Sequence, residues 1–187
     1  MTMRIRSLVP HATFRALIVV TLAIWCPVPG QTQMSGNQTP EKRDTFEDWV
    51  VECYGKGGEE APCQAYQRVL TQNAQVAAMT IAITRRDIKG PAQIEIALPL
   101  GVNLATPPVL AIGDDLRIDL AWSRCLSEGC LVQGRLSQAI LASLMAAGSA
   151  GVDVVHPTGD VVTIPISTAG FKDAMKRLEA SHCAAQC

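Results

Sequence analysis

Residues 93–98 read QIEIAL, and residues 76–84 read VAAMTIAIT. In both stretches apolar side chains stand at every second position: Ile94, Ile96 and Leu98 in the first, and Met79, Ile81 and Ile83 in the second. In an extended chain, successive side chains point to opposite faces. Each stretch therefore predicts a β-strand with one buried face and one polar or small-residue face.

The same alternation extends along the chain in both directions. It predicts further strands over residues 46–54, 63–70, 109–112, 116–122, 130–136, 152–155 and 161–166. Turn residues at 113–115 and 157–160 indicate two hairpins. Two segments have helical spacing instead: residues 137–147, capped by Ser137, and a segment that opens after Ser167 or Thr168. We expect an antiparallel β-sandwich with two short peripheral helices, the second on the rim.

The first thirty residues predict an export signal. Arg4, Arg6 and Arg15 precede an uncharged apolar run, Ala16 to Trp25. As a helix this run spans about 15 Å, against about 30 Å of bilayer hydrocarbon, so it is too short for a stable membrane span. Cleavage is expected after Gly30, which leaves no transmembrane span and predicts a periplasmic, secreted or outer-surface location.

Composition bounds the remaining chain. The 187 residues include 16 basic and 17 acidic ones, 48% are apolar and 18% are charged. This balance predicts a compact domain and argues against nucleic-acid binding. Without residues 1–30 the chain has 13 basic and 17 acidic residues, a formal charge of −4. Residues 31–45 are expected to form a flexible leader, 46–180 the domain and 181–187 a cysteine-containing tail.

Six cysteines follow the export signal: Cys53, Cys63, Cys125, Cys130, Cys183 and Cys187. An even number in an oxidising compartment predicts disulfides. Short spans favour pairing Cys53 with Cys63 and Cys125 with Cys130, although six cysteines allow fifteen connectivities. The spacings are not typical of a zinc site or a C-x-x-C dithiol, so no metal is expected. For the tail, a Cys183–Cys187 disulfide is favoured over a thiol or metal site that includes His182.

The sequence carries no recognisable catalytic motif. His156 and His182 do not neighbour a plausible nucleophile, and the Gly-x-Ser-x-Gly, HExxH and phosphate-binding patterns do not occur. Two charged groups are interpreted as solvated surface: Asp114, Asp115 and Asp119, and Arg85 with Arg86. Trp49 and Trp122 are expected in the core. We therefore expect a protein that is not an enzyme and needs no cofactor.

Several short motifs occur in a fixed order: Phe46-x-Asp48-Trp49-x-Val51-x-Cys53, Cys63 with Gln67, Leu98-Pro99-x-Gly101-Val102, Cys125-x3-Gly129-Cys130, and Gly170-Phe171-x2-Ala174 before Leu178. Together they resemble the invasion-associated locus B family of Gram-negative bacteria over residues 46–180. The resemblance implies an immunoglobulin-like β-sandwich, two intradomain disulfides and a secreted or envelope-associated protein. The family takes its name from bacterial entry into host cells, has no catalytic residues to transfer, and does not include Cys183 and Cys187.

Three functional hypotheses follow. The first is an envelope protein that acts by contact with a protein partner in the envelope or on host cells, with a role in invasion. The second is a periplasmic housekeeping adaptor or inhibitor with no host role. The third is a thiol- or metal-handling protein that acts through Cys183 and Cys187.

Overall fold

The computed structural model describes residues 40–55, 62–71 and 77–186, with the backbone alone for 182–186. The predicted export signal, its cleavage site after Gly30, and residues 31–39 of the predicted leader lie outside this part. The described strands are β1 (Lys42–Phe46), β2 (Trp49–Cys53), β3 (Cys63–Leu70), β4 (Ala77–Thr84), β5 (Ala92–Leu98), β6 (Val109–Ile112), β7 (Leu116–Asp119), β8 (Ala121–Leu126), β9 (Gly129–Leu136), β10 (Ala150–Val155) and β11 (Val161–Ile166). The helices are α1 (Gln138–Ala146) and α2 (Phe171–Gln186).

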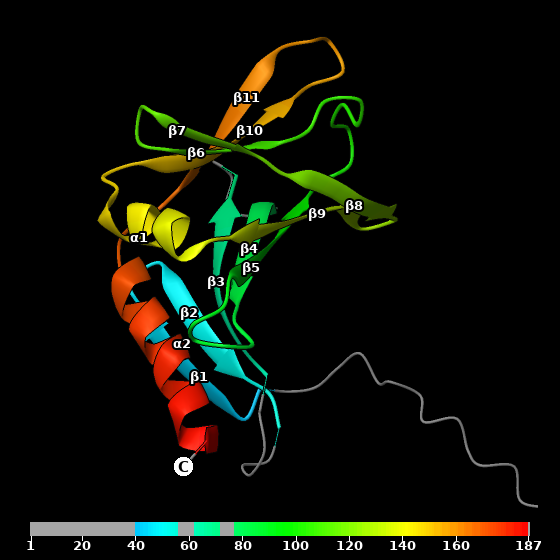
Figure 1. Cartoon of the computed structure of the whole chain (residues 1–187). Coiled ribbons are helices and arrows are strands. Elements are labelled where there is room, and N and C mark those ends of the chain that lie inside the picture. Colours follow the sequence, from blue (N-terminus) through cyan, green and yellow to red (C-terminus); the bar gives the residue numbers. More distant parts are fainter. Residues whose placement is uncertain (1–39, 56–61, 72–76, 187) are drawn as a thin grey trace, which may run out of the picture. The chain divides into compact units, whose positions relative to one another are not determined.

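The strands form two antiparallel sheets. The larger has the order β1-β2-β3-β4-β5-β9-β8, and the smaller has the order β11-β10-β6-β7 (Figure 1). Each pair of hydrogen-bonded neighbours runs antiparallel. The predicted all-β class, with two sheets and two helices, is confirmed.

One face of the seven-stranded sheet forms most of the hydrophobic core. Its buried side chains come from alternate positions of the strands: Trp49, Val51, Ala65, Met79, Ile81, Ile83, Ile94, Ile96, Leu98, Val132 and Leu136. The smaller sheet adds Leu110, Val152 and Ile166 to the same cluster, and α1 adds Leu141 and Leu144. The predicted cap of α1 is present, because the Ser137 hydroxyl accepts a hydrogen bond from the Ile140 amide at 3.3 Å.

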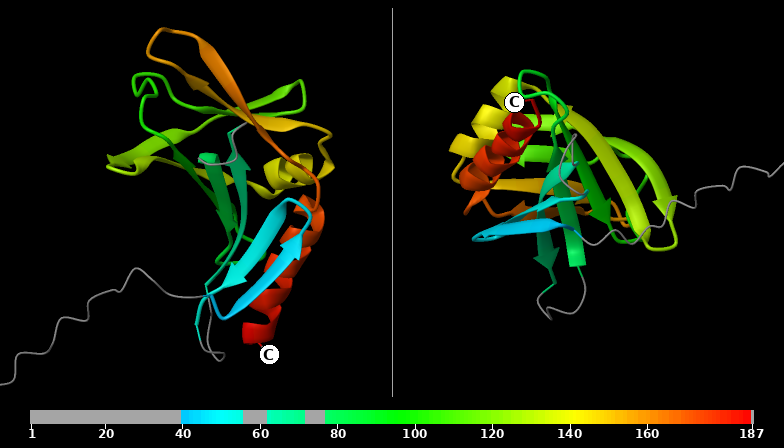
Figure 2. Two further views of the ribbon diagram at one scale, coloured as in Figure 1. Left: turned by 180° about the vertical axis from the view of Figure 1, so that it is seen from behind. Right: turned by 90° about the horizontal axis from the view of Figure 1, so that it is seen from below.

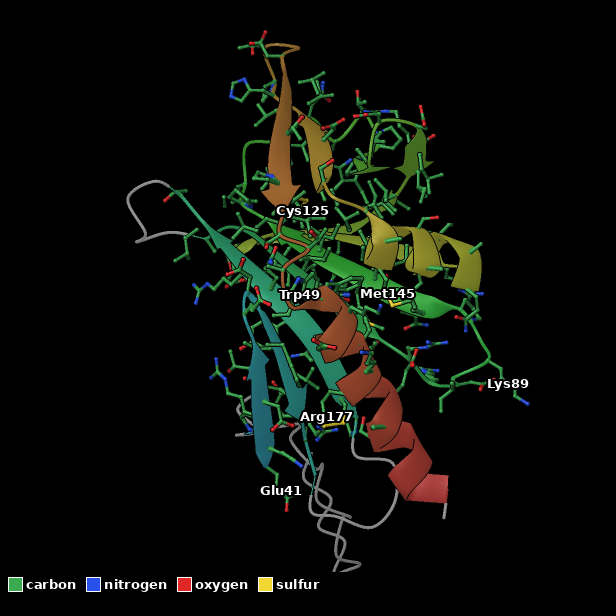
Figure 3. The ribbon with its side chains drawn as sticks, turned by 90° about the vertical axis from the view of Figure 1, so that its left-hand side faces the viewer. Glu41, Trp49, Lys89, Cys125, Met145 and Arg177 are labelled. Atoms are coloured by element: carbon green, nitrogen blue, oxygen red, sulfur yellow. A yellow bond between two sulfur atoms is a disulfide. The ribbon has the colours of Figure 1, made fainter. Side chains whose placement is uncertain are left out.

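Helix α2 covers the core face of β1, β2 and β3, where the sequence predicted a position on the rim (Figures 1 and 2). The ring of Trp49 packs against that of Phe171 with 4.7 Å between centroids. The Trp49 indole also donates a hydrogen bond to the Ser167 carbonyl at 2.8 Å. Figure 3 shows Trp49 beside the first turns of α2. Burial of these two large rings draws the helix onto the sheet.

Both boundaries predicted for the domain need correction. Residues 42–45, predicted within the flexible leader, belong to β1, which pairs along its whole length with β2. Arg177 of α2 donates to the Asp44 carboxylate at 2.6 Å, and this ion pair links β1 to the helix. At the other end, residues 181–186, predicted as a tail after the helix, continue α2. Neither polar segment has an apolar periodicity. Residues 42–45 are ordered by backbone pairing with β2, and residues 181–186 extend a helix that has already formed.

The strand predicted over residues 116–122 is divided between the two sheets. It breaks at Leu120, which is buried and whose amide donates to the Pro108 carbonyl at 2.8 Å. The chain then passes from β7 in the smaller sheet to β8 in the larger one. Trp122, predicted in the core, is half-buried at its margin, and its indole donates to the Thr106 carbonyl at 3.0 Å.

Two glycines of the family motifs have a steric role. Gly170 has φ +76°, and a Cβ there would lie 2.0 Å from the Phe46 carbonyl oxygen. Gly129 has φ +150°, and its Cβ would lie 2.3 Å from the Leu98 carbonyl oxygen. Both obstacles are backbone atoms, so a side chain cannot be accommodated by a change of rotamer. These positions let the backbone approach the carbonyl of a neighbouring strand closely.

Arg85 is buried, whereas the sequence predicted solvated surface. Only 3% of the residue is exposed. Its guanidinium contacts Glu179 of α2 with 2.5 Å between Nη1 and Oε1, and it donates to the carbonyls of Ile88 and Gly90. These partners offset the cost of burying the charge, although the Arg85 Nε has no hydrogen-bond partner. The contact joins the segment after β4 to α2.

Candidate functional site

The two local cysteine pairs are disulfide-bonded in the structure. Cys53 and Cys63 are directly opposite each other in β2 and β3, and Cys125 and Cys130 are directly opposite in β8 and β9. The bonds close loops with sequence separations of 10 and 5 residues. Each bond therefore fixes the register of a hairpin in the larger sheet.

The other residues selected from the sequence do not come together in one site. His156 is exposed and contacts the Thr158 hydroxyl at 2.8 Å, and Asp114, Asp115 and Asp119 are exposed. Within the described residues, no group of three or more His, Cys, Asp or Glu side chains is placed to hold a metal ion.

The side chains of His182, Cys183 and Cys187 lie outside the described part. The Cys183–Cys187 disulfide stays a prediction. Alkylation of the unreduced protein followed by mass spectrometry tests it, because the proposed bond leaves both thiols blocked.

Glu52 is the centre of a polar cluster on the outer face of the larger sheet, the face opposite the core. Glu52 is only 7% exposed, and its carboxylate accepts hydrogen bonds from the hydroxyls of Tyr54 at 2.7 Å and Tyr66 at 3.1 Å. Gln64 donates to Tyr54, and Arg43 donates to Tyr66. The bond to Glu52 is the main cause that raises the pKa of Tyr54, whereas burial and then Glu52 raise the pKa of Tyr66.

Next to this cluster lies a hollow that we call the polar trough, defined by Gln64, Tyr66, Gln93, Glu95, Gln133 and Arg135. It consists of two adjoining cavities of about 390 and 240 Å³, which share Gln64, Ala82 and Glu95. The side chains come from β3, β5 and β9. Their strand register places them in two neighbouring rows across the sheet.

A second hollow of about 430 Å³ opens between the two sheets, and we call it the apolar cleft. Leu98, Leu100 and Val102 form one wall, and Val154, Val162 and Ile164 form the other. Leu100 is 56% exposed and Val162 is 46% exposed. Exposed apolar side chains gathered around a cleft are typical of a surface that another molecule covers.

Strand β11 borders the apolar cleft and is an edge of the smaller sheet. Its sequence, VVTIPI, has no charged residue. Pro165 has no N–H to donate to its partner in β10, so this pair of residues is not hydrogen-bonded. Hydrogen-bonded and non-hydrogen-bonded pairs alternate along antiparallel strands. The backbone N–H and C=O groups of Val161 and Thr163 therefore point away from β10. The Thr163 hydroxyl donates to Asp153 at 2.6 Å, which is the main cause that lowers the pKa of Asp153.

The described chain contains neither a cluster suited to a metal nor a helix long and apolar enough to cross a bilayer. The polar trough and the apolar cleft are open hollows on its surface, and a third of about 320 Å³ lies between β3 and the end of β11. The fold and these hollows define a disulfide-linked, two-sheet β protein.

Comparison with known proteins identifies the family. The family model described as "Invasion associated locus B (IalB) protein" matches residues 49–179. The chain therefore belongs to the invasion associated locus B family. It is 27% identical over 147 residues to the "Invasion protein B homolog" of Brucella abortus strain 2308, covering 74% of this chain and 79% of that protein, with the same values for the homolog of biovar 1 strain 9-941.

The fold has a counterpart among solved structures. The crystal structure of invasion associated protein B from Bartonella henselae matches with a TM-score of 0.66 and 17% sequence identity. The match covers 75% of this chain and 98% of the Bartonella chain. The predicted family and fold class are thus both confirmed.

The motif Leu98-Pro99-x-Gly101-Val102, quoted from the sequence, lines the apolar cleft, whereas the sequence did not single out the residues that form the polar trough. Gln64, Gln93 and Gln133 all stand at outward positions of their strands, and this shared side-chain type was a usable signal. Their proximity depends on β9 lying beside β5, across about thirty residues of chain that form three other strands and their turns. The alternation of apolar and polar residues within one strand does not show which strands will be its neighbours in the sheet.

Proposed function

We propose that this chain is an exported, non-enzymatic protein of the cell envelope that acts through contact with a protein partner. Family membership supports an envelope role, the basic and apolar N-terminus supports export, and the two disulfides suit an oxidising compartment. The location follows as the periplasm or the outer surface.

The apolar cleft beside β11 is the observation that carries this proposal. A protein partner that offers an extended, uncharged segment would pair with the free backbone groups of Val161 and Thr163. One apolar side chain of that segment would enter the cleft between Leu100 and Val162. Pro165 lacks an N–H and would limit the added strand to the part of β11 near the hairpin turn.

The biological setting of this contact is a role in host-cell invasion. The names of the Brucella and Bartonella relatives refer to invasion, and this chain has the same domain. If the partner resides in the periplasm, the protein is instead a housekeeping adaptor.

Site-specific photo-cross-linking in intact cells tests the proposal. A cross-linking residue at Val162 should yield one defined protein adduct, which should disappear in the variant Leu100→Glu. The same residue at Lys176, on the exposed side of α2, is the matched control and should yield no such adduct. Equal adducts at both positions, or an adduct that survives Leu100→Glu, would contradict contact through the cleft.

Cell fractionation and an invasion assay test the finer claims. Export predicts that the protein is released with the periplasm or cleaved by protease added to intact cells, whereas recovery in the cytoplasm would contradict export. A strain that lacks the protein should enter cultured host cells less often than its complemented parent. Unchanged entry, with protection from external protease, would favour the housekeeping role.

A further inference from the structure

The edge strands of the two described sheets differ in their protection against pairing with another strand. These edge strands are β1, β8, β7 and β11. Charged residues occur in β1 (KRDTF) and in β7 (LRID), and β8 (AWSRCL) has Arg124 with an irregular register beside it. Charges and irregularities of this kind hinder the addition of a further strand. β11 (VVTIPI) has a regular register and no charge, so its edge is the least protected of the four.

The hydrogen bonds of the β10–β11 hairpin determine which backbone groups of β11 are free. The His156 amide donates to the Asp160 carbonyl at 2.8 Å, so this pair of residues is hydrogen-bonded. Bonded and unbonded pairs alternate from there along the hairpin, which makes Val162 bonded to β10 and leaves Val161 and Thr163 unbonded. The free N–H and C=O groups of β11 therefore stand at equal distances on the two sides of Val162.

This edge is complementary to itself. A second copy related by a two-fold axis at Val162 places its Thr163 opposite Val161 and its Val161 opposite Thr163. Both pairs are of the hydrogen-bonded type, so the contact uses both free N–H groups of each copy. An axis moved to Thr163 would set Pro165 opposite Val161, where the proline ring takes the place of a donor. The register centred on Val162 is therefore the better one.

The side chains at this contact are apolar and accessible. Val161 is 65% exposed and Val162 is 46% exposed. The hairpin projects away from α2 and from β1 and β2 (Figures 1 and 2). At the axis, Val162 faces Val162 of the second copy in an unbonded pair, the position at which opposite side chains lie closest. The pairing thus adds an apolar side chain to the wall of the apolar cleft and removes exposed apolar surface from water.

Identical copies have the same net charge, so their contact must keep like charges apart. Asp160, next to β11, lies opposite Ile164 of the second copy in this register. The two Asp160 residues are then four positions apart along the strands, about 13 Å, which exceeds the screening length of about 8 Å at physiological salt. Asp153, beside Thr163 in β10, is already paired with Arg117. Neither carboxylate therefore opposes its own copy.

We propose that the protein partner at the apolar cleft is a second copy of this chain, joined by antiparallel pairing of β11 with β11 about Val162. This inference rests on the proposed function, because it names the partner for the contact proposed there. The two smaller sheets then form one continuous sheet across the dimer. Because one short strand makes the contact, the interface is small and dimerisation should depend on protein concentration.

Sedimentation of the purified, oxidised protein over a range of concentrations tests this proposal. The parent should form a dimer. Val162→Glu and Val162→Lys should each weaken dimerisation by about tenfold or more, because like charges then face each other at the axis. An equimolar mixture of the two variants should recover the dimer, because opposite charges then face each other. Leu126→Glu, at an exposed apolar residue of the β8 edge, is the matched control and should dimerise like the parent.

Three results would overturn the proposal: a parent that stays monomeric at every concentration, single variants that dimerise like the parent, or a mixture that is no more dimeric than the single variants. Cross-linking at Val162 in cells separates this inference from the proposed function. An adduct with twice the mass of the chain supports both. An adduct with a different protein overturns the second copy as the partner and leaves the proposed function in place, whereas the absence of any adduct contradicts the proposed function itself.

Discussion

The two faces of the seven-stranded sheet use the same strands for different purposes. On the core face, Trp49 packs against Phe171 of α2, Ile94 belongs to the same hydrophobic cluster, and both are fully or almost fully buried. On the outer face, the neighbouring Gln93 and Glu95 are exposed and no described element covers them. Because successive side chains point in opposite directions, packing determines one set of positions and leaves the other set free. Recognition can therefore evolve on the outer face without loss of the core.

The largest expected effect comes from the core face. Trp49→Ala removes a ring that contacts Phe171 and a hydrogen bond to Ser167, and should lower the free energy of unfolding by about 3–5 kcal/mol. Urea denaturation measures this change. Trp122→Ala, at the half-buried tryptophan, is the control and should cost clearly less. Equal losses would show that α2 does not depend on the Trp49 contact.

The disulfides should have the next largest effect, because they hold hairpins on which both faces depend. Replacing Cys53 and Cys63 by serine should cost about 2–4 kcal/mol. The shorter loop of Cys125 and Cys130 should cost less by about 0.6 kcal/mol, since its sequence separation is half as large. Denaturation of both double variants without reductant compares them. A larger loss for the shorter loop would contradict loop closure as the cause.

The hydrogen bonds from Tyr54 and Tyr66 to Glu52 on the outer face should be detectable when the tyrosines are titrated. Glu52→Gln removes the carboxylate that Tyr54 and Tyr66 share, so the pKa of both should fall toward about 10. Tyrosinate absorbance in a spectrophotometric titration measures the shift. Glu95→Gln is the control, because Glu95 is not among the groups that shift either tyrosine. Coincident curves for the parent and Glu52→Gln would refute the cluster.

These tyrosines also make stability depend on pH. In the folded protein each pKa is raised above the ordinary value of about 10, so the folded state keeps a proton that the unfolded chain has lost. Their contribution to stability is complete below pH of about 10 and declines as the pH rises toward the folded pKa. In Glu52→Gln this alkaline decline should be smaller.

Much of the core face could be predicted from the sequence. The alternation around Ile81 and Ile94 gave strands that the structure contains, and Ser137 marked the start of α1 correctly. Local signals suffice there because burial and capping act over a few residues. β1 escaped prediction because its sequence, KRDTF, is polar and its order comes from pairing with β2.

The remaining differences depend on contacts between distant parts of the chain. Arg85 is buried because Glu179, 94 residues away, lies beside it in the fold. The strand predicted across Leu120 is divided because its two halves pair with different partners, β6 and β9. The polar trough likewise needs the order β3-β4-β5-β9, which no local pattern specifies.

The most direct test of the contrast between the faces is urea unfolding of two variants in the same strand. Ile94→Ala, on the core face, should lower the free energy of unfolding by about 2–5 kcal/mol. Gln93→Ala/Gln133→Ala, on the outer face, should change it by less than about 1 kcal/mol. Comparable losses in the two variants would contradict the claim that the outer face is free of a structural role.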